Sequence, residues 1–221
     1  MKPKRIILVR HGESVGNVDH NIYETVPDWK IDLTQIGRMQ AVSAGQQIKS
    51  LVGDETVKVY SSPYYRTRQT LQGIREGGLD KNIVNAFEDP RLREQDWGHT
   101  GDVSGRSAMI DERNEFSTFY YRIKDGESGA DVFDRVSTFF ETMHRDFFRN
   151  SFPENVVIVT HGMTLRLFLM RWFHWTPEEF ENVRNPYNGQ VFVMNNKSSR
   201  RDMGSRFELE TKLRYRDGAT D

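Results

Sequence analysis

The chain has 221 residues, 31 of them basic and 32 acidic, so its formal net charge is -1. This balance argues against capture of nucleic acid or of an anionic membrane by bulk electrostatics, although it leaves room for a basic pocket. Because the chain contains no cysteine, disulfides, thiolate catalysis and cysteine-based zinc sites are excluded.

The N-terminal stretch MKPKRIILV has basic residues but only a short apolar run before Arg10. A secretory signal needs about 7–15 apolar residues and a membrane helix needs about 20, and no stretch approaches either length. We therefore expect a cytoplasmic protein without membrane contact. A chain of this length most simply forms one domain, over residues 1–221.

Short apolar, β-branched runs alternate with helical patterns along the chain. The strands are predicted over residues 5–9, 57–61, 83–87, 156–160 and 190–195. The helices are predicted over 35–51, after Pro63, over 107–121, over 129–149, after His161 and from Pro177, and an edge strand is predicted within 206–215. This order predicts an α/β fold, a three-layer sandwich whose mixed, mostly parallel central sheet has helices on both faces.

The stretch 129–149 carries an apolar, aromatic stripe at three- and four-residue spacing, with Phe139, Phe140 and Phe147 among its members. Such a stripe lines a ligand groove in some proteins, but packing against a core is the far more common use. We interpret it as core.

Two histidines follow predicted strands directly. His11 follows IILVR and His161 follows VVIVT, and each is succeeded by glycine, which permits a sharp backbone turn. Ligands of open α/β sheets bind outside the carboxyl ends of the strands. Two histidines placed in this way favour a functional site over packing.

Arginines accompany these strand ends. Arg10 precedes His11, and Arg66 and Arg68 lie within SSPYYRTRQT, just after the strand 57–61. Guanidinium groups bind phosphate oxygens in a planar, bidentate manner. The alternative is a solvated helix face, and spacing alone does not decide between the two for Arg66 and Arg68.

A phosphate held by these groups would need a nucleophile and an acid. Neutral imidazole can attack phosphorus to give a phosphohistidine, and the departing alkoxide needs a proton. The sequence shows no metal-ligand cluster and no phosphate-binding P-loop, so histidine is the strongest candidate nucleophile, and no cofactor is expected. For the acid, the residues alone leave four candidates open: Glu13, Glu94, Asp96 and Asp102.

The chain resembles the histidine phosphatase superfamily, the phosphoglycerate mutase-like proteins. Its RHGESVGN, residues 10–17, is similar to the stretch that defines the family. The resemblance continues, in order, through LTQIGRMQA (33–41), SSPYYRTRQT (61–70), RLREQDWG (91–98), DGES (125–128) and VTHGMTLR (159–166).

This resemblance implies roles for particular residues. His11 would be the nucleophile and Glu94 the general acid and then the base that activates water. The residues that would bind the transferring phosphoryl group are Arg10, Arg66, His161 and Asn17. Ser14 is a weaker candidate for a phosphate contact, and Arg166 is a weaker candidate for bracing the site.

The superfamily contains phosphatases and mutases. The mutases carry an FTGW-like loop soon after the asparagine, and here that region reads VDHNIYETVPDWKIDLT without it. We therefore expect a phosphatase acting on a small-molecule phosphomonoester, with a mutase primed by 2,3-bisphosphoglycerate and a non-catalytic phospho-ligand binder as alternatives. The intact set of nucleophile, acid and second histidine argues against the binder.

The segment FYYRIKDGES, residues 119–128, resembles the stretch that fructose-2,6-bisphosphatases use around a second anionic group. Tyr120, Tyr121, Arg122 and Lys124 are therefore possible substrate-binding residues, with a solvated helix end as the equal alternative. The remaining histidines are expected in polar loops or on helix faces, and His99 alone is a minor candidate for the pocket mouth. The sequence gives no oligomeric state.

Overall fold

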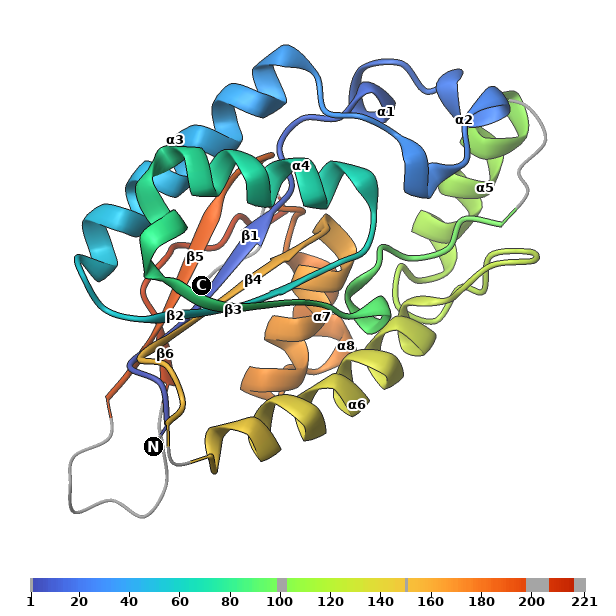
Figure 1. The fold of residues 1–221 in the computed structure, drawn as a ribbon. Coiled ribbons are helices and arrows are strands. Elements are labelled where there is room, and N and C mark those ends of the chain that lie inside the picture. The colour runs from blue at the N-terminus through green and yellow to red at the C-terminus, as the bar shows by residue number, and fades with distance from the viewer. Residues whose placement is uncertain (1, 99–102, 150, 198–206, 217–221) are drawn as a thin grey trace.

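A mixed six-stranded sheet forms the middle layer of this computed structural model, which describes residues 2–98, 103–149, 151–197 and 207–216 (Figure 1). The strands are β1 (Arg5–Arg10), β2 (Val57–Ser61), β3 (Ile83–Glu88), β4 (Asn155–Thr160), β5 (Val191–Asn196) and β6 (Phe207–Leu209), in the spatial order β3-β2-β4-β1-β5-β6. The first four are parallel, whereas β5 is antiparallel to β1 and β6 to β5. The predicted fold class is confirmed.

The helices occupy both faces of the sheet. They are α1 (Val15–Val18), α2 (Ile22–Thr25), α3 (Gln35–Val52), α4 (Tyr65–Ile74), α5 (Val103–Phe116), α6 (Gly129–Phe147), α7 (Gly162–Phe173) and α8 (Pro177–Asn182). The short 3₁₀ helices are η1 (Asp28–Lys30), η3 (Asp80–Asn82) and η4 (Pro90–Leu92), and η2 (Arg75–Leu79) is a π-helical segment that continues α4. Figure 1 shows α3 and α4 over one face of the sheet and α6, α7 and α8 over the other.

Strand β1 illustrates why the central strands are apolar on both sides. Ile6 and Leu8 belong to the core cluster that includes α6 and α7, while Ile7 and Val9 belong to the cluster that includes α3. Successive side chains of a strand point to opposite faces, so a strand covered by helices on both sides has no polar face. None of its apolar residues 6–9 is exposed.

The two long helices on opposite faces begin at side-chain caps. The Thr34 hydroxyl accepts a hydrogen bond from the Gly37 amide at the start of α3, and Ser128 and Asp131 form a reciprocal capping box at the start of α6. The stripe of α6, including Phe139 and Phe147, packs in the core cluster, which confirms the core interpretation.

Two predicted elements differ from the structure. The helix predicted over 107–121 is α5, which begins at Val103 and ends at Phe116. It ends there because the Ser117 hydroxyl accepts hydrogen bonds from the amides of Phe119 and Tyr120, which gives these amides partners outside a helix. The predicted edge strand within 206–215 is limited to β6, and Arg206 lies outside the described residues.

No helix within the described ranges is long and apolar enough to cross a membrane. That residues 1–221 form one domain stays a prediction.

Candidate active site

The carboxyl ends of β1, β4 and β2 lie at the same edge of the sheet, with β4 between the other two. Arg10 ends β1 opposite Thr160, which ends β4, so the histidines that follow them are neighbours. The His11 amide donates to the Thr160 carbonyl oxygen at 2.9 Å, and the centroids of the His11 and His161 rings are 5.1 Å apart. The sheet therefore brings together two residues that are far apart in the sequence.

His11 is buried, and its Nδ1 lies 2.7 Å from the Gly12 carbonyl oxygen. A carbonyl oxygen can only accept, so the proton of the neutral ring is on Nδ1 and the lone pair is on Nε2. Burial first, and then the charges of Arg66 and Arg10, hold the pKa of His11 well below its usual value of 6.5. The ring is consequently neutral at physiological pH, the form that can act as a nucleophile.

His161 is buried as well, and its Nε2 lies 2.8 Å from the Ser62 hydroxyl oxygen. That oxygen also accepts from the Tyr64 amide at 3.3 Å, and when the hydroxyl donates to Nε2 the ring proton of neutral His161 resides on Nδ1. Burial and then the charge of Arg66 lower the pKa of His161 well below its usual value. A neutral ring with a buried Nδ1–H is suited to donate to a phosphoryl oxygen.

The two predicted phosphate-binding arginines are both anchored. Arg10 donates from Nη1 to the Pro186 carbonyl oxygen, and burial lowers its pKa from the usual value. Arg66 is buried on α4 and donates to the backbone oxygen and the carboxylate of Asp28. Their positive charges lie close enough to His11 to act on its pKa.

The turn after His11 depends on a close backbone approach. A Cβ atom at Gly12 would lie 2.2 Å from the Gly37 carbonyl oxygen, and one at Gly37 would lie 2.0 Å from the Glu13 carbonyl oxygen. Side chains are therefore excluded at both positions. The Gly12 amide donates to the Thr70 hydroxyl of α4, which fixes the turn against that helix.

Asn17 faces the same edge of the sheet through α1. Its Oδ1 accepts from the Ser14 amide, from the Ser14 hydroxyl and from Asn188 Nδ2, at 3.0, 3.1 and 3.0 Å. Asn188 Nδ2 also lies 3.3 Å from the His11 carbonyl oxygen. With its oxygen fully used, the Asn17 amide group has its NH₂ left to donate, as the predicted role requires.

Glu94 lies at the N-terminus of α7, the helix that begins directly after His161. Its Oε1 accepts from the Thr164 amide, the Thr164 hydroxyl and the Gln95 amide, and its Oε2 accepts from the Met163 amide, at 3.1–3.2 Å. A carboxylate there satisfies backbone donors that have no partner within the helix and complements the helix dipole. These bonds fix both carboxyl oxygens beside the second histidine.

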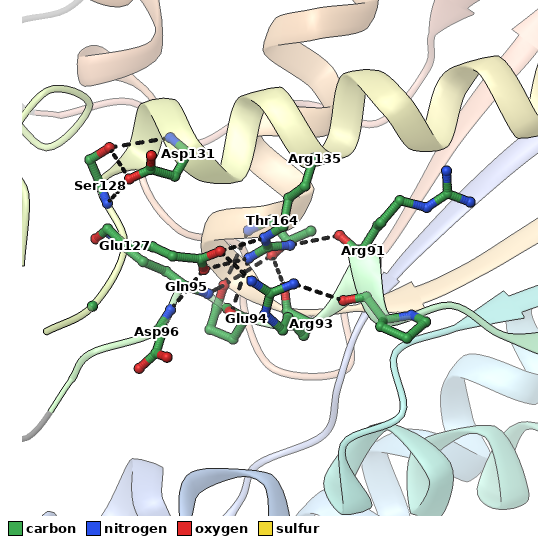
Figure 2. A network of polar contacts seen from close by, with 12 residues as sticks. Arg91, Arg93, Glu94, Gln95, Asp96, Glu127, Ser128, Asp131, Arg135 and Thr164 are labelled. Carbon is green, nitrogen blue, oxygen red and sulfur yellow. Dashed lines mark hydrogen bonds and ion pairs between the residues drawn. The ribbon is translucent and has the colours of Figure 1, made fainter.

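The loop that carries Glu94 is held by a charged network (Figure 2). Glu127 accepts from Arg93, from Arg135 and from the Asp96 amide, and Arg135 donates to the Glu94 carbonyl oxygen at 3.1 Å. Arg135 projects from α6, and Glu127 lies just before Ser128, the N-cap of that helix, so the network ties the loop of Glu94 to α6.

Five buried side-chain nitrogen or oxygen atoms within the described residues have no hydrogen-bond partner: Arg10 Nε, Arg113 Nε, Thr118 Oγ1, His161 Nδ1 and Arg166 Nε. Unpaired buried polar atoms are costly and are commonly found where a ligand binds. Two of the five belong to the phosphoryl site described above. An anion there would satisfy both donors.

The other three atoms belong to Arg113, Thr118 and Arg166. Arg113 and Arg166 both lie against Met163 Sδ, at 3.8 and 3.9 Å, and Arg166 also donates to the Phe180 carbonyl oxygen. Burial and then the charge of Arg113 lower the pKa of Arg166 to about 9. Arg166 is thus anchored to Met163 and Phe180, and its bracing role stays a prediction.

The structure does not bring the other possible substrate-binding residues to the strand ends. The Tyr121 hydroxyl donates to Glu112 at 2.7 Å, Arg122 pairs with Asp131 at 2.7 Å, and Lys124 is exposed. Tyr120 is exposed as well. Their role in substrate binding stays a prediction, and the two residues with carboxylate partners would have to exchange them for substrate.

Of the rival acids, Glu13 accepts from the Thr34 hydroxyl at 2.7 Å, and the Asp96 carboxylate accepts from the Gly98 amide at 2.9 Å. Asp102 and the minor candidate His99 lie outside the described residues. Within the described part of the chain, no group of three or more histidine or acidic side chains could hold a metal ion.

Three residues at the site were missed by the sequence analysis: Asp28, Ser62 and Asn188. Ser62 follows the end of β2 as the histidines follow β1 and β4, so the same strand-end argument could have identified it. No local signal marks Asn188, which is adjacent to His11 only because β5 lies beside β1.

A separate cavity of about 890 Å³ is lined by residues of α6 and α7, among them Phe140 and Trp172. None of the predicted site residues lines it.

Comparisons with known proteins agree with this geometry. The family model of the histidine phosphatase superfamily (branch 1) matches residues 6–205. The phosphoglycerate mutase-like protein AT74H of Arabidopsis thaliana is 45% identical over 210 residues, which cover 88% of this chain and 74% of that protein.

Two further proteins are similar to this chain at lower identity. The broad-range acid phosphatase DET1 of Saccharomyces cerevisiae is 29% identical over 285 residues, covering 87% of this chain and 85% of that protein. The solved structure of YhfR from Bacillus stearothermophilus has a TM-score of 0.73 and 23% identity, and the match covers 94% of this chain and 96% of that one. This likeness shows that the two share a fold.

Proposed function

This chain belongs to the histidine phosphatase superfamily, and we propose that it hydrolyses small phosphomonoesters through a phosphohistidine formed on His11. The observation that carries the proposal is the pairing of two buried, neutral histidines with two anchored arginines at one sheet edge. Such a site offers a neutral imidazole as the nucleophile and fixed positive charge that can bind the phosphoryl oxygens.

The first half of the reaction transfers the phosphoryl group. Arg10, Arg66, Asn17 and the His161 Nδ1–H hold the phosphoryl oxygens. The Nε2 lone pair of His11 attacks phosphorus, the P–O ester bond breaks, and the leaving oxygen takes a proton from Glu94. The alcohol departs and a phosphohistidine remains.

The second half returns the enzyme to its starting state. Glu94, now a carboxylate held at the N-terminus of α7, removes a proton from water. The water oxygen bonds to phosphorus, the N–P bond breaks, and inorganic phosphate leaves. Glu94 is again protonated and His11 is again neutral, so atoms and charges balance over the cycle.

Hydrolysis is favoured over phosphoryl transfer between substrate positions. The FTGW-like loop of the mutases is missing from residues 18–34, and the relative DET1 is a broad-range acid phosphatase. We accordingly assign the chain to phosphomonoesterases of the histidine acid phosphatase type. The cytoplasmic location and the absence of nucleic-acid and membrane partners stay predictions.

The buried charge beside Glu94 supports a substrate with a second anionic group. Arg113 and Arg166 each have a buried Nε without a partner among the described residues, and burial lowers the pKa of both despite the nearby charge of Glu94. A carboxylate or second phosphate near them would satisfy these donors. Tyr121, Arg122 and Lys124 would then line the outer part of the substrate site.

The decisive experiment measures inorganic phosphate released from a panel of phosphomonoesters, without added metal, with and without 2,3-bisphosphoglycerate. We expect release that is independent of the bisphosphate and abolished by His11→Ala. His174→Asn serves as the control, because His174 has a left-handed backbone that asparagine tolerates and lies outside the site.

The alternatives have distinct signatures. Bisphosphate-dependent isomerisation with little phosphate release would identify a mutase. Binding of orthovanadate without either activity would identify a phospho-ligand binder. Hydrolysis retained by His11→Ala would refute the phosphohistidine mechanism.

A further inference from the structure

The Arg66 guanidinium is held by a single residue of another segment. Arg66 Nη1 donates to the Asp28 backbone oxygen at 2.7 Å and to its Oδ1 at 2.9 Å, and Nη2 lies 3.3 Å from Oδ2. The Arg66 side chain is only 4% exposed, whereas that of Asp28 is 29% exposed. The contact is therefore a largely buried ion pair at the rim of the phosphoryl site.

The geometry of this pair leaves one edge of the guanidinium available. A guanidinium has five N–H donors, and the three contacts with Asp28 use both of those on Nη1 and one on Nη2. The donors that remain are the Nε–H and the second Nη2–H, which are parallel and form a fork. That fork matches two oxygens of a phosphoryl group.

Asp28 is itself fixed against α4. It begins the short 3₁₀ helix η1 (Asp28–Lys30). Two and three residues past that helix the chain is tied to Gln69, which donates to the Asp32 carboxylate at 2.6 Å and accepts from the Leu33 amide at 2.7 Å. Gln69 is three residues after Arg66, so both side chains lie on one face of the helix. The carboxylate thus has a defined position before any ligand arrives.

We propose that Asp28 is a positioning residue that fixes the Arg66 guanidinium with its Nε–Nη2 edge toward the phosphoryl group, an inference that rests on the proposed function. The carboxylate favours phosphate binding by orienting Arg66, although its negative charge opposes that binding. An anion next to a phosphate site repels phosphate, so electrostatics alone predicts that its removal tightens binding. The positioning role predicts instead that removing the carboxylate weakens phosphate binding, because the Arg66 guanidinium is then no longer held in the orientation that binds two phosphoryl oxygens.

The test is equilibrium binding of inorganic phosphate and of orthovanadate, measured by titration calorimetry on the metal-free full chain. The variants are Asp28→Ala, which removes the carboxylate, and Asp28→Asn, which removes its charge but keeps its shape; both retain the backbone oxygen that accepts from Arg66. Glu88→Gln is the matched control, because Glu88 holds Arg68 of the same helix through two contacts of 2.6 Å at an exposed site. Urea unfolding of each variant shows whether it is folded.

We expect both Asp28 variants to bind either anion about tenfold more weakly than the wild type, the scale of one charge-assisted hydrogen bond. Glu88→Gln should match the wild type. In an Arg66→Lys background, Asp28→Asn should cause no further loss, since the arginine fork is already gone.

Tighter binding by the Asp28 variants would overturn the proposal and show that Asp28 competes with phosphate for Arg66. Unchanged binding would overturn it too, as would an equal loss in the Arg66→Lys background, which would indicate a general structural effect. If the wild type binds neither anion, the proposed function fails together with this inference; if it binds and hydrolyses normally, only the inference is at stake.

Discussion

Replacing Glu94 by glutamine separates its chemical role from its structural one. The glutamine carbonyl oxygen can still accept from the amide and hydroxyl of Thr164, but its NH₂ then faces the Met163 amide, which is 3.2 Å from Oε2 in the wild type. The Met163 amide would then face another donor and lose its hydrogen bond, which costs about 1–3 kcal/mol of stability. We therefore expect Glu94→Gln to lower the free energy of unfolding by this amount in urea titrations.

The catalytic effect should depend on the leaving group. An alkoxide needs the proton that Glu94 supplies, so kcat/KM for alkyl phosphates should fall by about 10²–10⁴-fold. p-Nitrophenolate leaves without protonation, so kcat/KM for p-nitrophenyl phosphate should fall far less. The comparison uses kcat/KM because kcat includes hydrolysis of the common phosphoenzyme, in which Glu94 also acts, whatever the substrate.

Glu13→Gln is the control for this prediction, since Glu13 is the rival acid closest to His11 in the sequence and its carboxylate accepts a hydrogen bond from the Thr34 hydroxyl. It should show no dependence on the leaving group. Equal losses of kcat/KM on both substrates for Glu94→Gln would refute its assignment as the acid.

Two further predictions concern the histidines. Ser62→Ala removes the hydrogen-bond partner of His161 Nε2. Losing that bond costs about 1–3 kcal/mol, so phosphate affinity and kcat should each fall by about fivefold or more. The control is Ser61→Ala, at the last residue of β2, which should leave activity unchanged. The pKa values of His11 and His161 are lowered in the folded protein, so below pH 6.5 the unfolded chain binds more protons than the folded one. The free energy of unfolding should therefore fall by up to about 1.4 kcal/mol per pH unit for each histidine as the pH drops below 6.5. Urea unfolding at pH 7.5 and 5.5 checks this, and His161→Asn should show a shallower pH dependence; an identical slope would contradict the burial argument.

Much of the fold follows from local patterns in the sequence. The runs at 6–9 and 156–159 are apolar on every residue, and only a strand covered on both faces has no use for a polar side. The cap at Thr34 and the spacing within 129–149 fix the starts and inner faces of α3 and α6 in the same local way. The end of α5 could not be predicted from the pattern, because the aromatic residues after Ser117 are compatible with a longer helix. The helix ends where it does because the Ser117 hydroxyl accepts from the amides of Phe119 and Tyr120.

For the candidate site, the sequence by itself determined which residue types stand at the strand ends: a histidine followed by glycine after β1 and again after β4, and an arginine at the start of α4. Only the tertiary structure decided that β4 lies between β1 and β2, which brings His11, His161 and Ser62 together. The structure also decided how Asp28 orients Arg66 and how α7 fixes Glu94. Strand order and loop docking arise from contacts between segments far apart in the chain, and no local pattern of residues encodes them.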